Sequence, residues 1–185
     1  MKNNTSRRLF LRNSAIATTG MAFLSSTSVL HALTREESPF EGYNPYAETK
    51  TDLRASRFFG KHITVKGKIF DKNGTFSIAN AKVEVWHLSP NSTKYRHRAI
   101  LKTNNSGEYQ FITDFPNREY GKIARIFFKV SKNETSYFTE LFVSDFGANI
   151  SGKHWEENNK LGKELFPKKE TFFNKTTFTF NISLK

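Results

Sequence analysis

The chain contains no cysteine among its 185 residues. This absence excludes disulfides, zinc–thiolate sites, iron–sulfur clusters and cysteine nucleophiles. Any bound metal would therefore need His, Tyr or carboxylate ligands. Glycine and proline are also scarce, at ten and five residues, whereas aromatic residues make up 15% of the chain and include 19 phenylalanines. Such a composition supplies enough apolar surface for a folded core, and the length fits one domain with a short additional segment.

Long runs of basic residues are also missing, although the formal net charge is +12. Four basic residues, Lys2, Arg7, Arg8 and Arg12, lie in the first 32 residues, which carry no acid and leave a net charge of about +8 on the remainder. A positive balance permits contact with nucleic acid, anionic glycans or lipid head groups. Because the lysines are scattered along the chain, we expect no nucleic-acid partner.

The N-terminus also lacks a strongly apolar run. Ser6-Arg7-Arg8-Leu9-Phe10-Leu11-Arg12 is followed by a weakly apolar stretch, residues 15–30, that is rich in Ser and Thr. A membrane anchor needs ~20 strongly apolar residues, so an anchor or a cytoplasmic amphipathic helix is disfavoured. The segment resembles a bacterial twin-arginine signal peptide. We expect residues 1–32 to direct export to the periplasm or beyond, with cleavage near Ala32 and no transmembrane span.

Apolar residues recur at every second position in several short runs, a period typical of half-buried strands. The runs cover residues 63–69, 83–85, 109–111, 126–130 and a closing strand over 177–184, and turn-forming Asn, Asp, Gly and Pro residues separate them. Strands at this spacing predict an all-β fold, an antiparallel β-sandwich over residues 63–185. Residues 33–62 are predicted to wrap this sandwich, and residues 155–165 to form a short helix or ordered loop.

Three motifs then carry a resemblance to a known family. They are Val83-Glu84-Val85-Trp86-His87, Tyr95-Arg96-His97 and Phe115-Pro116-Asn117-Arg118-Glu119-Tyr120-Gly121-Lys122. Together they resemble the intradiol ring-cleavage dioxygenases, in particular small exported members, over most of the chain after residue 32. The Gly-turn strands around Gly67 and Gly107 by themselves also suit transthyretin-like or carboxypeptidase-regulatory sandwiches.

The resemblance implies Fe(III) held by two tyrosinates and two histidines, and oxygenative cleavage of catechol-type aromatics. The tyrosinates would be Tyr95 and Tyr120. The family places its histidines in a His-x-His pair just after the second tyrosine, where this chain has Arg125 and Phe127. Neither side chain can ligate iron, and a guanidinium keeps its positive charge. We therefore expect the family's reaction to be impaired or lost.

Three functions stay open at this point. The first is a degenerate relative that binds a small aromatic or anionic molecule, with Arg125 and Lys122 as ligand-binding residues. The second is an active ferric enzyme with a rebuilt ligand set, for which His97, His87 and Glu140 are possible substitutes. The third is a non-enzymatic β-sandwich binding module of the carboxypeptidase-regulatory type. Every single Tyr or His among these candidates also has an ordinary role as a packing or hydrogen-bonded residue.

Overall fold

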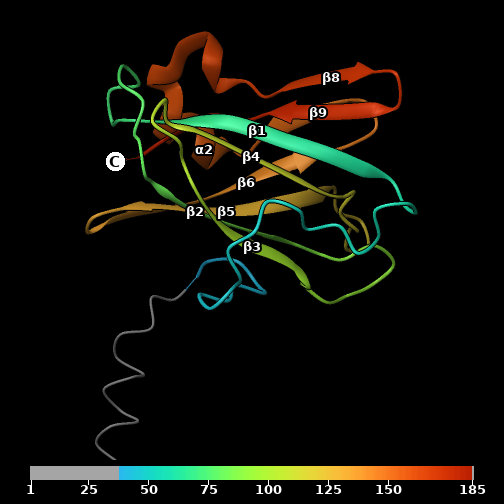
Figure 1. The fold of residues 1–185 in the computed structure, drawn as a ribbon. Helices are drawn as coiled ribbons and strands as arrows, with labels where there is room; N and C mark the ends of the chain where they lie inside the picture. The colour runs from blue at the N-terminus through green and yellow to red at the C-terminus, as the bar shows by residue number, and fades with distance from the viewer. Residues whose placement is uncertain (1–37, 185) are drawn as a thin grey trace, which may run out of the picture. The chain divides into compact units, whose positions relative to one another are not determined.

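The computed structural model describes residues 38–184, which form two packed β-sheets (Figure 1). The first sheet contains β1 (His62–Phe70), β4 (Glu108–Asp114), β8 (Lys168–Phe172), β9 (Lys175–Thr179) and β10 (Ile182–Ser183). The second contains β2 (Lys82–His87), β3 (His97–Lys102), β5 (Ala124–Lys132), β6 (Thr135–Val143) and β7 (Ala148–Ile150). The predicted signal peptide lies outside the described residues.

The second sheet is antiparallel throughout, in the order β3-β2-β5-β6-β7. In the first sheet β1 pairs antiparallel with β4 along one edge, and parallel with β9 and then β10 along the other. Parallel pairing needs a long crossover connection, and the chain between β1 and β9 supplies it. The predicted antiparallel β-sandwich is confirmed, with β1 as the strand that also has parallel partners.

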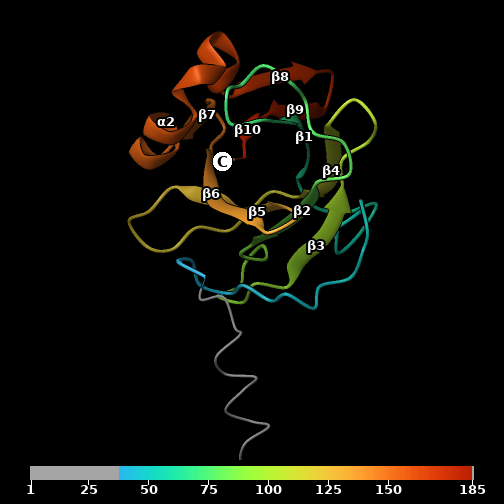
Figure 2. The ribbon, with the colours of Figure 1, turned by 90° about the vertical axis from the view of Figure 1, so that its left-hand side faces the viewer.

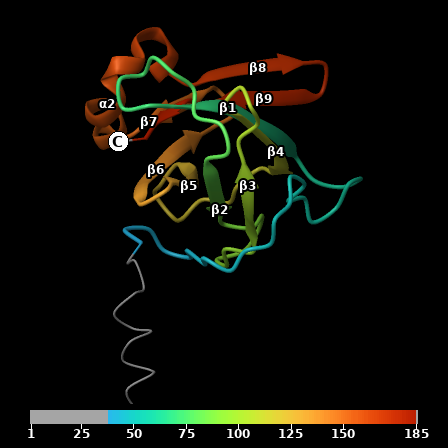
Figure 3. The ribbon, with the colours of Figure 1, turned by 60° about the vertical axis from the view of Figure 1, so that its left-hand side comes forward.

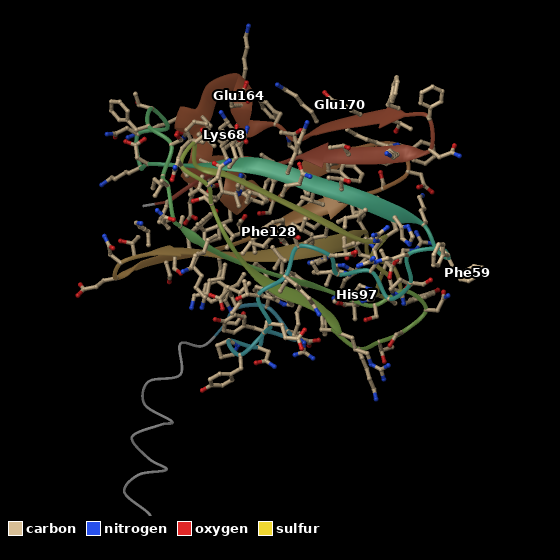
Figure 4. All side chains as sticks on the ribbon, viewed as in Figure 1. Phe59, Lys68, His97, Phe128, Glu164 and Glu170 are labelled. Atoms are coloured by element: carbon tan, nitrogen blue, oxygen red, sulfur yellow. The ribbon has the colours of Figure 1, made fainter. Side chains whose placement is uncertain are left out.

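Alternating burial along the strands places one face of each sheet in a common core. In β1 every second residue is buried, and in β5 the residues that face the core are Ile126, Phe128 and Val130. Phe128 lies between the two layers in Figure 4, and its ring contacts those of Phe111 and Phe180 from the opposite sheet. The strand period seen in the sequence therefore reflects burial between the sheets.

Helix α2 (Gly152–Asn158) and the 3-10 helix η1 (Asn159–Leu165) lie beside β7 and β10, near the C-terminal end (Figures 2 and 3). Ser151 caps α2 by accepting a hydrogen bond from the His154 backbone. The predicted short helix is thus present, but it begins three residues earlier than expected. No helix of residues 38–184 has the length and apolar character that a bilayer crossing requires.

Residues 38–61 run across the strands without forming one of their own. Within this segment, Thr51 accepts a backbone hydrogen bond from Ile112, and Leu53 donates one to the same residue. Glu48 similarly accepts from the Ile100 backbone. These bonds attach the segment to β3 and β4, and they bring Phe40 and Tyr43 over the outer face of the second sheet, described next.

Candidate functional site

The outer face of the second sheet carries a layer of aromatic rings around Phe127. Its ring stacks on Phe40 with centroids 4.8 Å apart and lies 5.6 Å from the Trp86 ring. The Trp86 indole in turn donates a hydrogen bond of 2.9 Å to the Glu41 carbonyl. Phe127 is therefore covered by the N-terminal segment, and its side chain is buried although it points away from the main core.

Tyr95 borders this aromatic layer. Its half-buried ring lies 6.1 Å from the Phe127 ring and packs directly on Gly42, where any side chain would collide with it. Gly42 also has a φ of +76°, a conformation that glycine adopts at little cost. Burial raises the pKa of the Tyr95 phenol, and the nearby Glu119 adds to that shift. The phenol is therefore protonated at neutral pH.

Arg125 lies beside Phe127 on the same outer face of β5, as predicted from strand alternation. Its Nη1 donates a hydrogen bond of 2.9 Å to Oε2 of Glu140, whose side chain is only 12% exposed. The guanidinium also sits 5.2 Å from the centre of the Phe142 ring. Arg125 is thus held by a partner on β6, and the charge of Glu140 is balanced by it.

The loop before β5 holds the other two predicted residues. Lys122 forms an ion pair with Glu119, and this pairing lowers the pKa of the Glu119 carboxyl. Tyr120 is fully exposed and makes no hydrogen bond or ring contact with any residue in 38–184. The structure therefore brings Tyr95 near Arg125, while Tyr120 points into solvent.

His87 and His97 lie on the opposite, inner face of the second sheet, where their rings stack with centroids 4.9 Å apart. His87 is completely buried, with Nδ1 2.8 Å from the Leu88 carbonyl and Nε2 2.7 Å from Thr113 Oγ1. Burial lowers the pKa of His87 to about 3, so its imidazole is neutral. The sheet itself separates these rings from the aromatic layer around Phe127.

His97 belongs to a buried polar chain. Its Nε2 lies 2.8 Å from Asp114 Oδ2, and its Nδ1 lies 2.8 Å from Ser89 Oγ. The same Asp114 oxygen accepts the Ala55 N–H, and His62 Nε2 lies 3.2 Å from Oδ1. Although a Ser-His-Asp order resembles a hydrolase triad, the Ser89 and Ala55 amides are both already used in internal hydrogen bonds and cannot serve an oxyanion. We interpret these hydrogen bonds as a network that fixes the position of the His97 ring.

The residues carried over from the dioxygenase family do not form a ligand set for iron in this structure. Tyr95 is packed against Gly42, Tyr120 faces solvent, and the two candidate histidines have other partners on the far side of the sheet. Within residues 38–184, no group of three or more His, Asp or Glu side chains is arranged to hold a metal ion. The donor atoms present do not fit a ferric site.

A cavity of about 750 Å³ opens next to the His97 network. Both polar and apolar side chains line it. The polar ones are Arg54, Lys61, Ser89, Arg96, His97 and Asp114. The apolar ones are Leu53, Phe59, Pro90 and Phe115. Arg54 pairs with Asp52, and its hydrogen bonds lower the pKa of that carboxyl to about 2. The Arg96 side chain has no ion-pair partner among residues 38–184.

Known proteins are similar to this chain in part of its sequence and in most of its fold. No family model matches the chain. A Rickettsia felis protein named "Putative dioxygenase" is 32% identical over 104 residues, which cover 42% of this chain and 50% of that protein. A Rickettsia typhi protein with a similar name is 31% identical over 135 residues, which cover 57% and 64%. The matched region thus spans half to about two thirds of these relatives.

Solved structures match over a larger share of the chain. The dioxygenase domain of a Streptomyces dioxygenase–carbohydrate-binding fusion gives a TM-score of 0.61 at 16% identity, covering 82% of this chain and 97% of that domain. An intradiol ring-cleavage dioxygenase from Tetranychus urticae gives 0.59 at 16% identity, covering 80% and 91%. The chain has the intradiol dioxygenase fold. The resemblance seen in the sequence motifs is therefore confirmed at the level of the fold.

The sequence motifs do not indicate the cavity or the hydrogen-bond network around His97 within this intradiol dioxygenase fold. The sequence predicts His97 as a possible metal ligand, and no motif indicates a role for Ser89, Asp114 or Arg54. The available signal was the placement of polar residues at three strand ends, because His87 ends β2, His97 begins β3 and Asp114 ends β4. Strand alternation would have put both histidines on the core face, where polar groups need partners.

Proposed function

We propose that the protein is an exported relative of the intradiol dioxygenases that does not cleave rings and binds a small anionic aromatic molecule. The loss of chemistry is supported by what surrounds Arg125 and Phe127. Arg125 carries a permanent positive charge held by Glu140, and Phe127 is fixed by its stack with Phe40. Neither side chain offers a ligand atom to a ferric ion, and Arg125 is already held in its ion pair.

The ligand is inferred from the cavity, and this observation carries the binding proposal. Arg96 offers an unpaired guanidinium at its wall, which suits a carboxylate because two N–H groups can bind its two oxygens. Leu53 and Phe115 supply apolar wall on which an aromatic ring can pack. Arg125 is held by Glu140, so we place the proposed ligand at Arg96 rather than at Arg125.

Isothermal titration calorimetry with benzoate and 4-hydroxybenzoate tests the binding proposal. We expect binding by the unmodified chain, and an affinity at least about tenfold weaker in Arg96→Ala, because the loss of a charge-assisted pair removes 1.4 kcal/mol or more. Arg98→Ala is the matched control, since Arg98 lies two residues further along the chain, in β3, and does not line this cavity. Arg125→Ala should bind normally.

Two results would count against the proposal. The absence of heat across a panel of benzoates and catechols would rule out an anionic aromatic ligand. Weaker binding by Arg125→Ala alone, with normal binding by Arg96→Ala, would place the ligand at Arg125.

Export is tested by a separate measurement, because Arg7→Lys together with Arg8→Lys should retain the precursor in the cytoplasm. Undiminished export of that variant would reject the signal assignment.

A further inference from the structure

Exposed hydrophobic side chains gather at one end of the sandwich. Within residues 38–184, eleven large hydrophobic side chains are exposed, and seven of them lie in four loops, the last of which is taken to begin at the final residue of β8. These loops cover residues 56–61, 115–123, 144–147 and 172–174, and we call them together the aromatic end. Its exposed hydrophobic residues are Phe58, Phe59, Tyr120, Ile123, Phe146, Phe172 and Phe173.

The strand order explains why the four loops meet. Strand β9 runs parallel to β1, so the turn before β9 lies beside the loop before β1. Strand β4 is antiparallel to β1 and ends where β1 begins, which places loop 115–123 at the same end. An ion pair between Lys61 and Asp145 ties loop 144–147 to them. Figure 1 shows these loops on the right, and Figure 4 shows Phe59 projecting outward there.

Positive charge is concentrated among the same loops. Including Lys175, which directly follows the β8–β9 turn, they contain five basic and two acidic residues, a net charge of +3. Both acids are already paired, Asp145 with Lys61 and Glu119 with Lys122. Arg118 and Lys175 have no acidic partner among the described residues. Arg118 and Lys175 therefore carry positive charge at this end that no acidic residue of the described structure balances.

We propose that the aromatic end docks on an anionic phospholipid surface. Aromatic side chains interspersed with Lys and Arg are the composition of protein surfaces that bind at the membrane interface, where rings enter the head-group region and cations meet lipid phosphate. Phe146 is 99% exposed and Phe173 85%, and each sits at the tip of a turn. Phe172 and Phe173 contact each other edge-on, with centroids 4.5 Å apart, and Phe146 lies in a different loop. Rings carried on separate short loops can enter a fluid head-group layer, whereas a protein partner or second copy would need a continuous complementary surface.

Vesicle co-sedimentation of the full chain tests the proposal, with phosphatidylcholine vesicles that contain phosphatidylglycerol. We expect the double variant Phe172→Ser, Phe173→Ser to bind at least about tenfold more weakly, and Lys175→Glu to weaken binding further. Phe76→Ser and Phe166→Ser are matched controls, because both rings are exposed at the opposite end of the strands. All variants keep residues 1–37, so any binding by that segment is common to every sample.

A second measurement keeps the proposal testable if a variant misfolds. In a chain with Phe173→Trp, tryptophan emission should shift to shorter wavelength when anionic vesicles are added, whereas Phe76→Trp should give no additional shift. Equal vesicle binding by the loop variants and the controls would overturn the proposal. Equal affinity for vesicles of pure phosphatidylcholine would also overturn it, as would a dimer in solution that disappears with Phe172→Ser, Phe173→Ser.

Discussion

At the scale of single residues, Arg125 is the side chain that most constrains the chemistry of the fold. Glu140 is the only acidic residue that pairs with it in the described structure, across the β5–β6 strand pair. Phe127 occupies the neighbouring position on the same face and is closed over by Phe40. A metal ion at this place would have to displace a satisfied ion pair and a buried ring, and each displacement costs free energy.

The corresponding prediction concerns iron and colour. After incubation with ferric iron and desalting, the purified chain should be colourless and contain no stoichiometric iron, because neither Arg125 nor Phe127 supplies a ligand. The measurement is elemental analysis together with the visible spectrum, in which tyrosinate-to-iron charge transfer would give a burgundy band. A coloured protein that loses its band in Tyr95→Phe would show that the ferric site exists and would end the iron-free proposal.

The sequence predicts part of this residue-scale arrangement. Alternation along a strand is a local property, so Arg125 and Phe127 could be assigned to one face before the structure was known. The partner of Arg125 could not be assigned in the same way, since Glu140 reaches it through the strand register of β5 and β6. The position of Tyr95 on the other face from His97 was also beyond the sequence, because Tyr95 precedes β3 and depends on how the loop enters that strand.

At the scale of secondary-structure elements, the closing segment of the chain is divided into two strands by a break in the pairing opposite Gly67. Strand β9 pairs with β1 up to Lys66, and β10 pairs with β1 from Ile69 onward. Between them, the Phe180 backbone donates to the Lys66 carbonyl, and Asn181 Oδ1 accepts from the Lys68 backbone. The predicted single strand over 177–184 is therefore two strands, which a local alternation of apolar residues cannot distinguish from one.

Gly67 is required because the Phe180 carbonyl approaches β1 closely at this break, and its substitution gives the next prediction. A Cβ at this position would lie well inside van der Waals distance of the Phe180 carbonyl oxygen, which is backbone and cannot move alone. Gly67→Ala should therefore lower the free energy of unfolding by about 3 kcal/mol or more. Gly147→Ala is the matched control, since its Cβ would meet no atom within 4 Å. Urea unfolding curves that show equal stability for both variants would contradict this role of Gly67.

At the scale of the whole molecule, two buried histidines link the stability of the fold to pH. His87 stacks on His97 between the sheets, and His154 on α2 packs against Phe180 while its Nδ1 lies 2.7 Å from Thr139 Oγ1. Burial lowers the pKa of His87 to about 3 and that of His154 to about 4. Both imidazoles must therefore stay neutral for the two layers and the helix to remain packed.

The last prediction follows from the sign of these shifts. In the unfolded chain the two histidines titrate near ~6.5, so below that pH the unfolded state binds more protons than the folded state. Stability is therefore fully present above about pH 6.5 and falls as the pH decreases toward 4, by up to about 2.7 kcal/mol per pH unit for the two groups together. Urea unfolding midpoints measured from pH 8 to pH 5 should show this fall, and His154→Gln should reduce the slope by about half. A stability that stays constant between pH 7 and pH 5 would mean that the two rings are not held neutral by burial.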